Sequence, residues 1–136
     1  MEIKKISKEK TWNLRHTVMW PNKELDYIKL DQDDSGIHYG LFEKGRLISV
    51  VSLFIENEDA QFRKFATLQS EQGKGFGSKL LNHVVEEAKR VGIKRIWCNA
   101  RLNKSSFYKK FGLQESEHKF QKGGLDYVIM ERLLDV

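Results

Sequence analysis

Apolar and polar residues alternate with a period of two in several short stretches of this chain, and that period is typical of half-buried strands. The clearest case is the apolar run at residues 47–55, which follows residues 37–42 after the short turn 43–46. Gly45 suits a left-handed position in that turn, so the two stretches are predicted to form a hairpin. The full set of predicted strands is 2–6, 37–42, 47–55, 60–68, 93–100, 113–121 and 125–134.

Apolar residues recur at helical spacing between several of these strands. The first predicted helix follows Ser7, a good N-cap residue, and ends before Pro21. The second covers residues 76–91, and Gly92 is its stop signal. Asn103 is expected to cap a short third helix. Each helix therefore lies between two predicted strands.

The order of these elements predicts the fold class. Antiparallel hairpins at both ends of the chain enclose one strand, helix and strand that are joined tightly enough to form a right-handed parallel unit. This order predicts a mixed α/β fold with a mostly antiparallel central sheet, a parallel strand–helix–strand unit and helices on both faces. A ligand can enter where the two parallel strands diverge. With 136 residues, of which 40% are hydrophobic, the chain 1–136 is expected to form a single domain.

Composition narrows the classes of function. The longest apolar run has the length of a strand and the N-terminus carries no leader pattern, so neither a membrane span nor a secretory signal is expected. Cys98 is the only cysteine, which excludes an internal disulfide and favours the cytoplasm. The net charge of +5 favours an anionic partner, but the basic residues are interleaved with 19 acids. Because no aromatic RNA-binding signature is present, a phosphorylated small molecule fits better than nucleic acid.

The second helix begins with a cluster of glycines in the stretch Gln72-Gly73-Lys74-Gly75-Phe76-Gly77. Glycine disfavours a helix interior by about 1 kcal/mol relative to alanine, so the cluster needs another reason. A helix N-terminus binds phosphate through unpaired N–H groups, and glycines let the phosphate come close. The P-loop pattern fails because Gly75 stands where a hydroxyl residue is required. The dinucleotide pattern fails because Gly77 is off register and the strand at 93–100 ends without a carboxylate.

A third pattern, Arg/Gln-x-x-Gly-x-Gly/Ala, does match the stretch that starts at Gln72. Residues 103–113, NKSSFYKKFGL, also look like an Asn-x-x-x-x-Phe-Tyr-x-x-x-Gly-Phe pattern, with three residues instead of four after Asn103 and with Leu113 in place of the usual aromatic. With these two motifs the chain resembles the GCN5-related N-acetyltransferases, whose fold is called acyl-CoA N-acyltransferase-like. The resemblance covers residues 60–116 and, more loosely, the hairpin before them. The N-terminal third matches only in element order.

This resemblance implies that the chain transfers the acetyl group of acetyl-CoA to a primary amine by direct attack in a ternary complex. The glycine stretch would hold the pyrophosphate and the preceding strand would line the pantetheine arm, whose amides bond to an open strand edge. No metal is expected. The cofactor-binding residues expected from the resemblance are Phe65, Ala66, Thr67, Gln72, Gly73, Lys74, Gly75, Phe76, Gly77, Ser78 and Asn103.

The resemblance also makes Tyr108 the expected catalytic residue, facing the sulfur of the thioester. Since a phenol pKa of about 10 exceeds a thiol pKa of about 8.5, a hydrogen bond to the departing thiolate is favoured over complete proton transfer. A main-chain N–H of Thr67 or Leu68 would hold the oxyanion. Six side chains could relay the proton that the amine must lose, and no spacing singles one out. They are Glu58, Asp59, Glu71, Glu115, Glu117 and His118.

Each of these assignments has a structural alternative. The glycines alone could make a tight turn, Tyr108 could be a core aromatic like Phe107 and Phe111, and Asn103 already has a purpose as a cap. Cys98 alternates with apolar neighbours and is expected to be buried. The four histidines show no pairing typical of a zinc site. A domain that binds acetyl-CoA without catalysis is the alternative at the level of function.

The segments of the chain that would bind the acceptor carry no diagnostic motif. A small-molecule amine and a peptide amine both fit, as do a monomer and a homodimer. Arg15, Trp20 and Tyr39 are candidates for shaping an acceptor pocket, although tryptophans are equally good core residues. The acidic cluster at residues 31–34 is expected to be a solvated loop that could attract a cationic amine.

Overall fold

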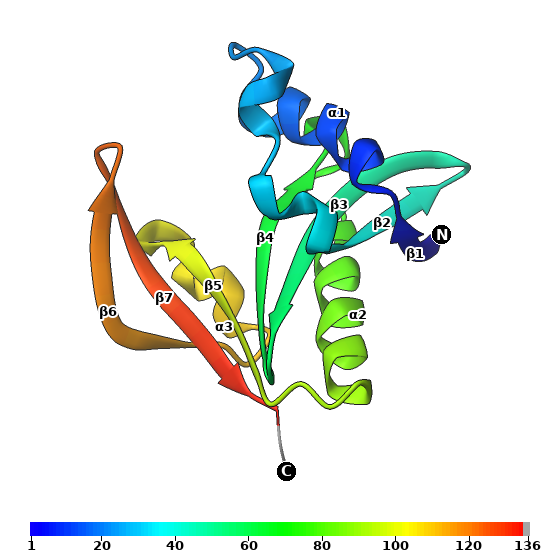
Figure 1. Ribbon diagram of the computed structural model, residues 1–136. Coiled ribbons are helices and arrows are strands. Elements are labelled where there is room, and N and C mark those ends of the chain that lie inside the picture. Colours follow the sequence, from blue (N-terminus) through cyan, green and yellow to red (C-terminus); the bar gives the residue numbers. More distant parts are fainter. Residues whose placement is uncertain (135–136) are drawn as a thin grey trace. The chain divides into compact units, whose positions relative to one another are not determined.

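Seven strands and three α-helices form the regular structure of residues 1–134, the part of the chain that the computed structural model describes (Figure 1). The strands are β1 (Glu2–Ile6), β2 (Ile37–Glu43), β3 (Arg46–Glu56), β4 (Asp59–Thr67), β5 (Arg95–Arg101), β6 (Gln114–Lys122) and β7 (Leu125–Leu133). The helices are α1 (Lys8–Met19), α2 (Phe76–Arg90) and α3 (Ser105–Lys109). Four short 3-10 turns complete the order: η1 (Leu25–Ile28), η2 (Asp31–Ser35), η3 (Gln69–Glu71) and η4 (Leu102–Lys104). Every predicted strand and helix is present, with ends displaced by a few residues.

The strands are hydrogen-bonded in the order β1-β2-β3-β4-β5-β7-β6. The pairings β1 with β2, β2 with β3, β5 with β7 and β6 with β7 are antiparallel. The pairing of β4 with β5 is parallel and joins Asp59–Gln61 to Arg95–Trp97. This topology confirms the predicted mixed α/β fold with a parallel strand–helix–strand unit inside a mostly antiparallel sheet.

The chain divides into two compact units, and strand β4 and helix α2 each contribute residues to both. The first unit comprises Met1–Phe54 and Arg63–Val84, and the second comprises Ile55–Phe62 and the chain from Val85 onward.

In the first unit, helices cover both faces of the sheet. Leu14 of α1 packs in one core cluster with Val50 of β3 and Ala66 of β4. Phe65 and Thr67, the neighbours of Ala66 along the strand, lie instead against Gly77 at the start of α2. Because successive side chains of a strand point to opposite faces, α1 and the start of α2 lie on opposite sides of β4.

Two turns follow the local signals in the sequence. Lys44 and Gly45 have φ of 52° and 77°, as the tight turn between β2 and β3 requires. Gly92 has φ of 87°, and the N–H of Ile93 donates to the carbonyl of Ala88 over 3.0 Å. This is the Schellman pattern expected where a glycine ends a helix.

In the second unit, β7 lies between β5 and β6 (Figure 1). Its inward residues Val128 and Met130 are fully buried. Cys98, opposite Met130 in the register of β5 with β7, is 3% exposed, and burial raises the pKa of its thiol to about 12. The thiol is therefore protonated at neutral pH, which confirms that Cys98 is a buried apolar residue rather than a nucleophile.

The predicted cap of the third helix is wrong. The chain leaves β5 through the 3-10 turn η4, which contains Asn103, before α3 begins at Ser105. The N-cap position is occupied by Lys104, and no side chain caps the helix. Asn103 is exposed inside the 3-10 turn, because that turn shifts the helix start by one residue.

Candidate active site

The glycine stretch forms a turn followed by the start of α2. Gly73 and Gly75 have φ of 79° and 86°, a backbone conformation that side chains with a Cβ rarely adopt. A Cβ added at either residue would have no heavy atom within 4 Å, so open space lies in front of both. The carbonyl of Gly75 accepts the first α2 hydrogen bond, from the N–H of Lys79 at 3.1 Å.

The backbone at this helix start suits an anion. The N–H groups of residues 75–78 precede the first helical hydrogen bond and so have no acceptor within the helix. The positive end of the helix dipole lies at the same place. A loop with open space in front of two glycines, followed by a helix N-terminus, fits a pyrophosphate.

Gly77 serves a different physical purpose in the motif from that of the other two glycines. Its φ is not in the left-handed region, and a Cβ there would lie 3.0 Å from Cζ of Phe65 and 3.2 Å from Oγ1 of Thr67. Gly77 therefore lets α2 approach β4 closely. The alternative of a simple tight turn does not account for this contact.

Side-chain contacts hold the loop to the end of β4. Nε2 of Gln72 donates to the carbonyl of Thr67 over 2.9 Å, and the hydroxyls of Thr67 and Ser49 are 2.8 Å apart. The N–H of Leu68 donates to the carbonyl of Ile48 over 2.9 Å. Leu68 is therefore not available to bind an oxyanion, and of the two expected donors only Thr67 remains.

A hollow of about 420 Å³ lies beside the loop in the first unit. Lys74 faces it and forms an ion pair of 3.3 Å with Glu71, which is weak because the lysine is half exposed. The positive side chains around the hollow outnumber the negative ones by three to two. The lining residues are Glu43, Lys44, Arg46, Ile48, Glu71, Lys74 and Phe76.

Tyr108 lies in α3, in the second unit, and is partly buried. Its ring centroid is 5.7 Å from that of Phe62 and 5.2 Å from that of Phe107. Burial raises the pKa of Tyr108 well above the usual value of a phenol, Cys98 adds to the shift and Arg101 partly opposes it. Tyr108 is therefore a hydrogen-bond donor throughout the neutral pH range.

Four of the six side chains considered for proton relay are engaged in ion pairs. Glu58 pairs with Lys94, Asp59 with Arg95, Glu71 with Lys74 and Glu115 with Lys109. Glu117 and His118 are exposed on β6. Across residues 1–134, no three His, Cys, Asp or Glu side chains are grouped so that they could hold a metal ion.

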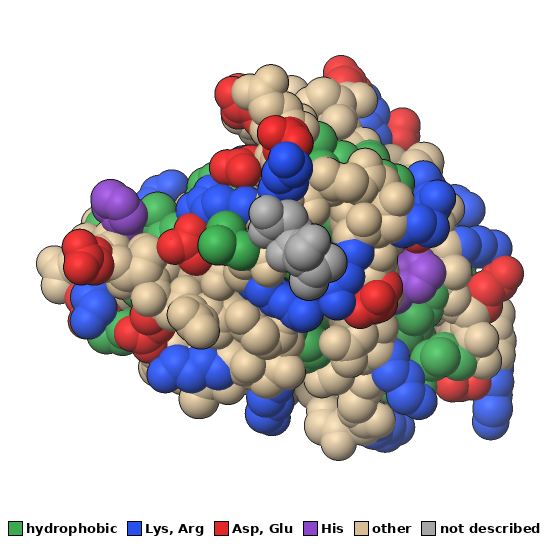
Figure 2. Space-filling model, turned by 90° about the horizontal axis from the view of Figure 1, so that it is seen from below, with side chains coloured by type: hydrophobic (Ala, Val, Ile, Leu, Met, Phe, Trp, Pro, Cys, Tyr) green, Lys and Arg blue, Asp and Glu red, His purple; other side chains and the backbone are tan. Residues whose placement is uncertain are grey.

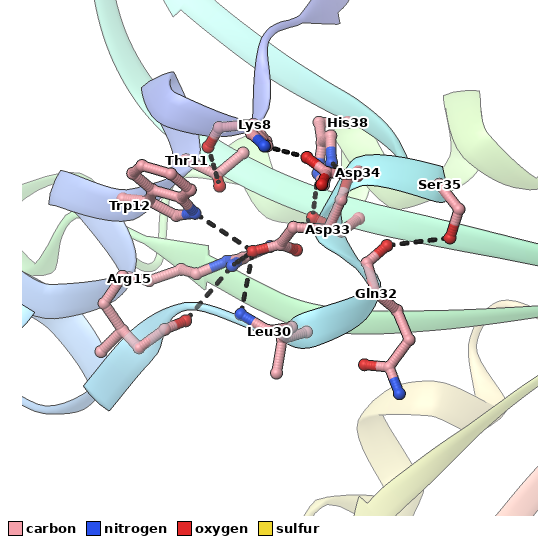
Figure 3. Close-up of polar contacts among 12 residues, drawn as sticks. Lys8, Thr11, Trp12, Arg15, Leu30, Gln32, Asp33, Asp34, Ser35 and His38 are labelled. Atoms are coloured by element: carbon pink, nitrogen blue, oxygen red, sulfur yellow. Dashed lines mark hydrogen bonds and ion pairs between the residues drawn. The ribbon is translucent and has the colours of Figure 1, made fainter. Parts of the chain in front are cut away.

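The sequence suggested that the acidic cluster at residues 31–34 is a solvated loop, and this is only partly correct. Asp33 is 3% exposed and accepts two hydrogen bonds from Arg15, of 2.8 and 3.0 Å (Figure 3). Arg15 is completely buried and Tyr39 is 2% exposed, so neither lines an open acceptor pocket. The signal that was missed is the spacing of Thr11 and Arg15, which are four residues apart and both buried on one face of α1.

On the face shown in Figure 2, Lys and Arg side chains are interspersed with Asp and Glu side chains. None of the helices in the described residues combines the length and the apolar character needed to cross a bilayer.

Comparison with known proteins identifies the family. The model of the Acetyltransferase (GNAT) family matches residues 6–113. YitI of Bacillus subtilis (strain 168), described as an uncharacterized N-acetyltransferase, is 30% identical over 144 residues, which cover 98% of this chain and 97% of YitI.

Two solved structures share the fold. The ribosomal-protein-S18-alanine N-acetyltransferase of Escherichia coli superposes with a TM-score of 0.83 at 16% identity, over 99% of this chain and 94% of that one. A GNAT family acetyltransferase from Elizabethkingia anophelis, with acetyl-CoA bound, superposes with a TM-score of 0.77 at 18% identity, over 98% and 97% of the two chains. The match of the family model and the similarity to YitI establish that the chain belongs to the GNAT acetyltransferase family.

Proposed function

We propose that this N-acetyltransferase binds acetyl-CoA along β4 and the glycine stretch and transfers its acetyl group directly to a primary amine. The observation that carries the proposal is the pair of left-handed glycines, Gly73 and Gly75, which open space in front of the N-terminus of α2. Negative charge is stabilised there by the helix dipole and by unpaired N–H groups. The whole chain 1–136 acts as one catalytic domain in this proposal.

In this proposal, each residue around the loop has its own role in binding the cofactor. The N–H groups of residues 75–78 bind the pyrophosphate, and Lys74 adds positive charge beside it. Gln72 keeps the loop against β4 through its bond to Thr67. The other cofactor-binding residues in this proposal are Phe65, Ala66, Gly73, Phe76, Gly77, Ser78 and Asn103.

Tyr108 donates a hydrogen bond to the sulfur that leaves. Burial raises the pKa of Tyr108, so transfer of its proton to a thiolate is even less favourable than for a phenol in water. Its contribution is the stabilisation of developing negative charge. The N–H of Thr67 binds the oxyanion, since that of Leu68 is already bonded to Ile48. Acetyl-CoA supplies the thioester carbonyl that the amine attacks.

The acceptor is a small-molecule or peptide amine, and the enzyme works in the cytoplasm as a monomer or homodimer. A reducing compartment agrees with the single buried and unpaired Cys98. Neither nucleic acid nor a membrane takes part.

The cofactor site is tested by calorimetric titration with acetyl-CoA. Gly75→Glu places a carboxylate where the pyrophosphate is expected and should abolish binding. Gly92→Glu is the matched control, because Gly92 has φ of 87° and open space around its Cβ position as well, but follows the other end of α2. Equal binding by wild type and Gly75→Glu would refute the assignment of the loop.

The role of Tyr108 is tested with Tyr108→Phe, which keeps the ring contacts with Phe62 and Phe107. We expect kcat to fall roughly 10- to 1,000-fold while acetyl-CoA binding is retained. A variant with unchanged kcat would show that Tyr108 is only a packing residue. The alternative of a non-catalytic acetyl-CoA-binding module predicts no acetyl transfer by the wild type to any amine.

A further inference from the structure

Arg63 is a partly buried cation on β4, and it has no carboxylate partner among residues 1–134. Its guanidinium carbon lies 5.9 Å from the ring centroid of Phe54, and this cation–π contact is its one direct contact of a polar or aromatic kind. Within residues 1–134, no carboxylate oxygen lies within ion-pair distance of it. Removing a cation from water without an anion is costly, so the position of Arg63 requires a reason.

The nearby acid Asp33 is not that partner, because its carboxylate pairs with Arg15. Its two oxygens accept hydrogen bonds from both terminal nitrogens of Arg15, from Nε1 of Trp12 at 3.1 Å and from the N–H of Leu30 at 3.0 Å (Figure 3). Three of these bonds end on Oδ2 and one ends on Oδ1. Arg15 and Asp33 neutralise each other, and the charge of Arg63 is left over.

The electrostatic balance of this region is consequently positive. Burial lowers the pKa of Arg63, repulsion by Arg15 lowers it further, and Asp33 only partly offsets these effects. A guanidinium remains charged in spite of such shifts. An anion brought to Arg63 would relieve both the loss of hydration and the repulsion by Arg15.

Arg63 also lies close to the reactive end of the proposed cofactor site. It precedes Phe65 by two residues on β4, with Lys64, whose φ is 57°, between them. In the proposed site, the cofactor is anchored at residues 72–78 and its arm runs back along residues 65–67, which places its thioester end toward Arg63. An acceptor that reaches the thioester from this part of the strand passes the guanidinium.

We propose that Arg63 binds a carboxylate of the acceptor, and that the enzyme therefore acetylates amines that carry a carboxylate close to the amino group. This inference rests on the proposed function. The amine nitrogen forms a bond to the acetyl carbon, the carbon–sulfur bond breaks, and the nitrogen loses one proton while the sulfur leaves as the thiol of coenzyme A. Polyamines, which carry only positive charge, are poor acceptors because Arg63 repels them.

The test compares acceptors that differ only in the carboxylate. Glycine, β-alanine and 4-aminobutyrate are each assayed beside the corresponding carboxamide, with 1,4-diaminobutane as the cationic member, by the release of free thiol from acetyl-CoA. At least one acid should exceed its amide in kcat/KM by roughly 10- to 100-fold, the range expected for charge-assisted hydrogen bonds. Arg63→Gln should abolish that preference by lowering kcat/KM for the acid.

Two further variants are a test of the paired N–H donors of the guanidinium and a control for surface charge. Arg63→Lys should keep part of the preference, because an ammonium supplies the charge but not the paired N–H donors. Lys10→Gln, which removes one positive charge from the exposed surface of α1, should leave the preference unchanged. Acetyl-CoA binding, measured by calorimetry, should be the same in all four proteins.

The outcomes distinguish the two proposals. The inference about the acceptor is overturned if acids are not acetylated better than amides, or if Arg63→Gln lowers kcat/KM equally for both. In that case, binding of acetyl-CoA by the wild type would still support the cofactor site. If the wild type does not bind acetyl-CoA, the proposed function fails and the inference fails with it.

Discussion

Asp33 is one of three aspartates within four residues, yet it differs from Asp31 and Asp34 in being buried. Burial alone would favour its neutral form, so the carboxylate depends on the hydrogen bonds that it receives. The side chain of Ser52, which accepts from Arg15 over 2.8 Å and lies 2.7 Å from Nδ1 of His38, ties the same group to β2 and β3. The acid thus fastens the connector of residues 22–36 to the sheet.

This environment predicts a specific dependence of stability on pH. Burial raises the pKa of Asp33, but hydrogen bonds from Arg15, Leu30 and Trp12 outweigh it and lower the pKa from 3.8 to about 2. Because the folded pKa is lower than the unfolded one, the stabilisation is present above pH 3.8 and is lost as the pH falls toward 2. Asp33→Asn should lower the free energy of unfolding at pH 7 by about 3–5 kcal/mol and remove this part of the acid sensitivity.

Urea unfolding at several pH values between neutrality and about pH 2.5 measures both effects. Asp34→Asn is the control, since the Asp34 side chain is 80% exposed and its pairing with Lys8 is worth at most about 1 kcal/mol. Equal losses in the two variants would mean that the buried pair contributes nothing beyond an exposed one.

At the scale of elements, local signals in the sequence correctly predicted the turns whose backbone geometry depends on neighbouring residues. The β2–β3 turn, the glycine that ends α2 and the glycine stretch before it are of this kind. The φ of 57° at Lys64, within β4, had no such signal, because lysine does not favour a left-handed conformation. That interruption of the strand is imposed by the surrounding structure.

The β2–β3 turn offers a test of this local account. Lys44 has φ of 52° beside Gly45, a position where asparagine is much preferred to lysine. Lys44→Asn should therefore stabilise the protein by roughly 0.5–1 kcal/mol and raise its thermal midpoint. Lys122→Asn is the matched control, because Lys122 also precedes a glycine but lacks a positive φ. A gain in the control as large as that of Lys44→Asn would contradict the explanation by backbone strain.

At the scale of the whole molecule, membership of the GNAT family identifies acetyl-CoA as the ligand of the chain. A ligand that binds only the folded state stabilises it by mass action, by about 2.7 kcal/mol at a concentration 100 times its Kd. Acetyl-CoA should therefore raise the thermal midpoint progressively with concentration, and NADPH should not. The measurement is thermal unfolding at a series of ligand concentrations. A shift with NADPH equal to that with acetyl-CoA would argue against a selective cofactor site.

The sequence by itself determined the order and type of the elements, the mixed sheet and the family motifs at Gln72 and Asn103. These features depend on periodicity, on turn residues and on short motifs, all of which are local along the chain. Sequence patterns also placed Cys98 in the core, since its neighbours alternate with it in a strand.

Only the tertiary structure decided the features that depend on residues far apart in the chain. The pairing of Arg15 with Asp33 spans 18 positions, the bond from Leu68 to Ile48 removes one of two oxyanion donors, and Gly77 is explained by its contact with Phe65. The surplus charge of Arg63 likewise appears only when Asp33 is seen to pair with Arg15. Burial and the partners of a polar group are set by the packing of distant segments, which no local pattern records.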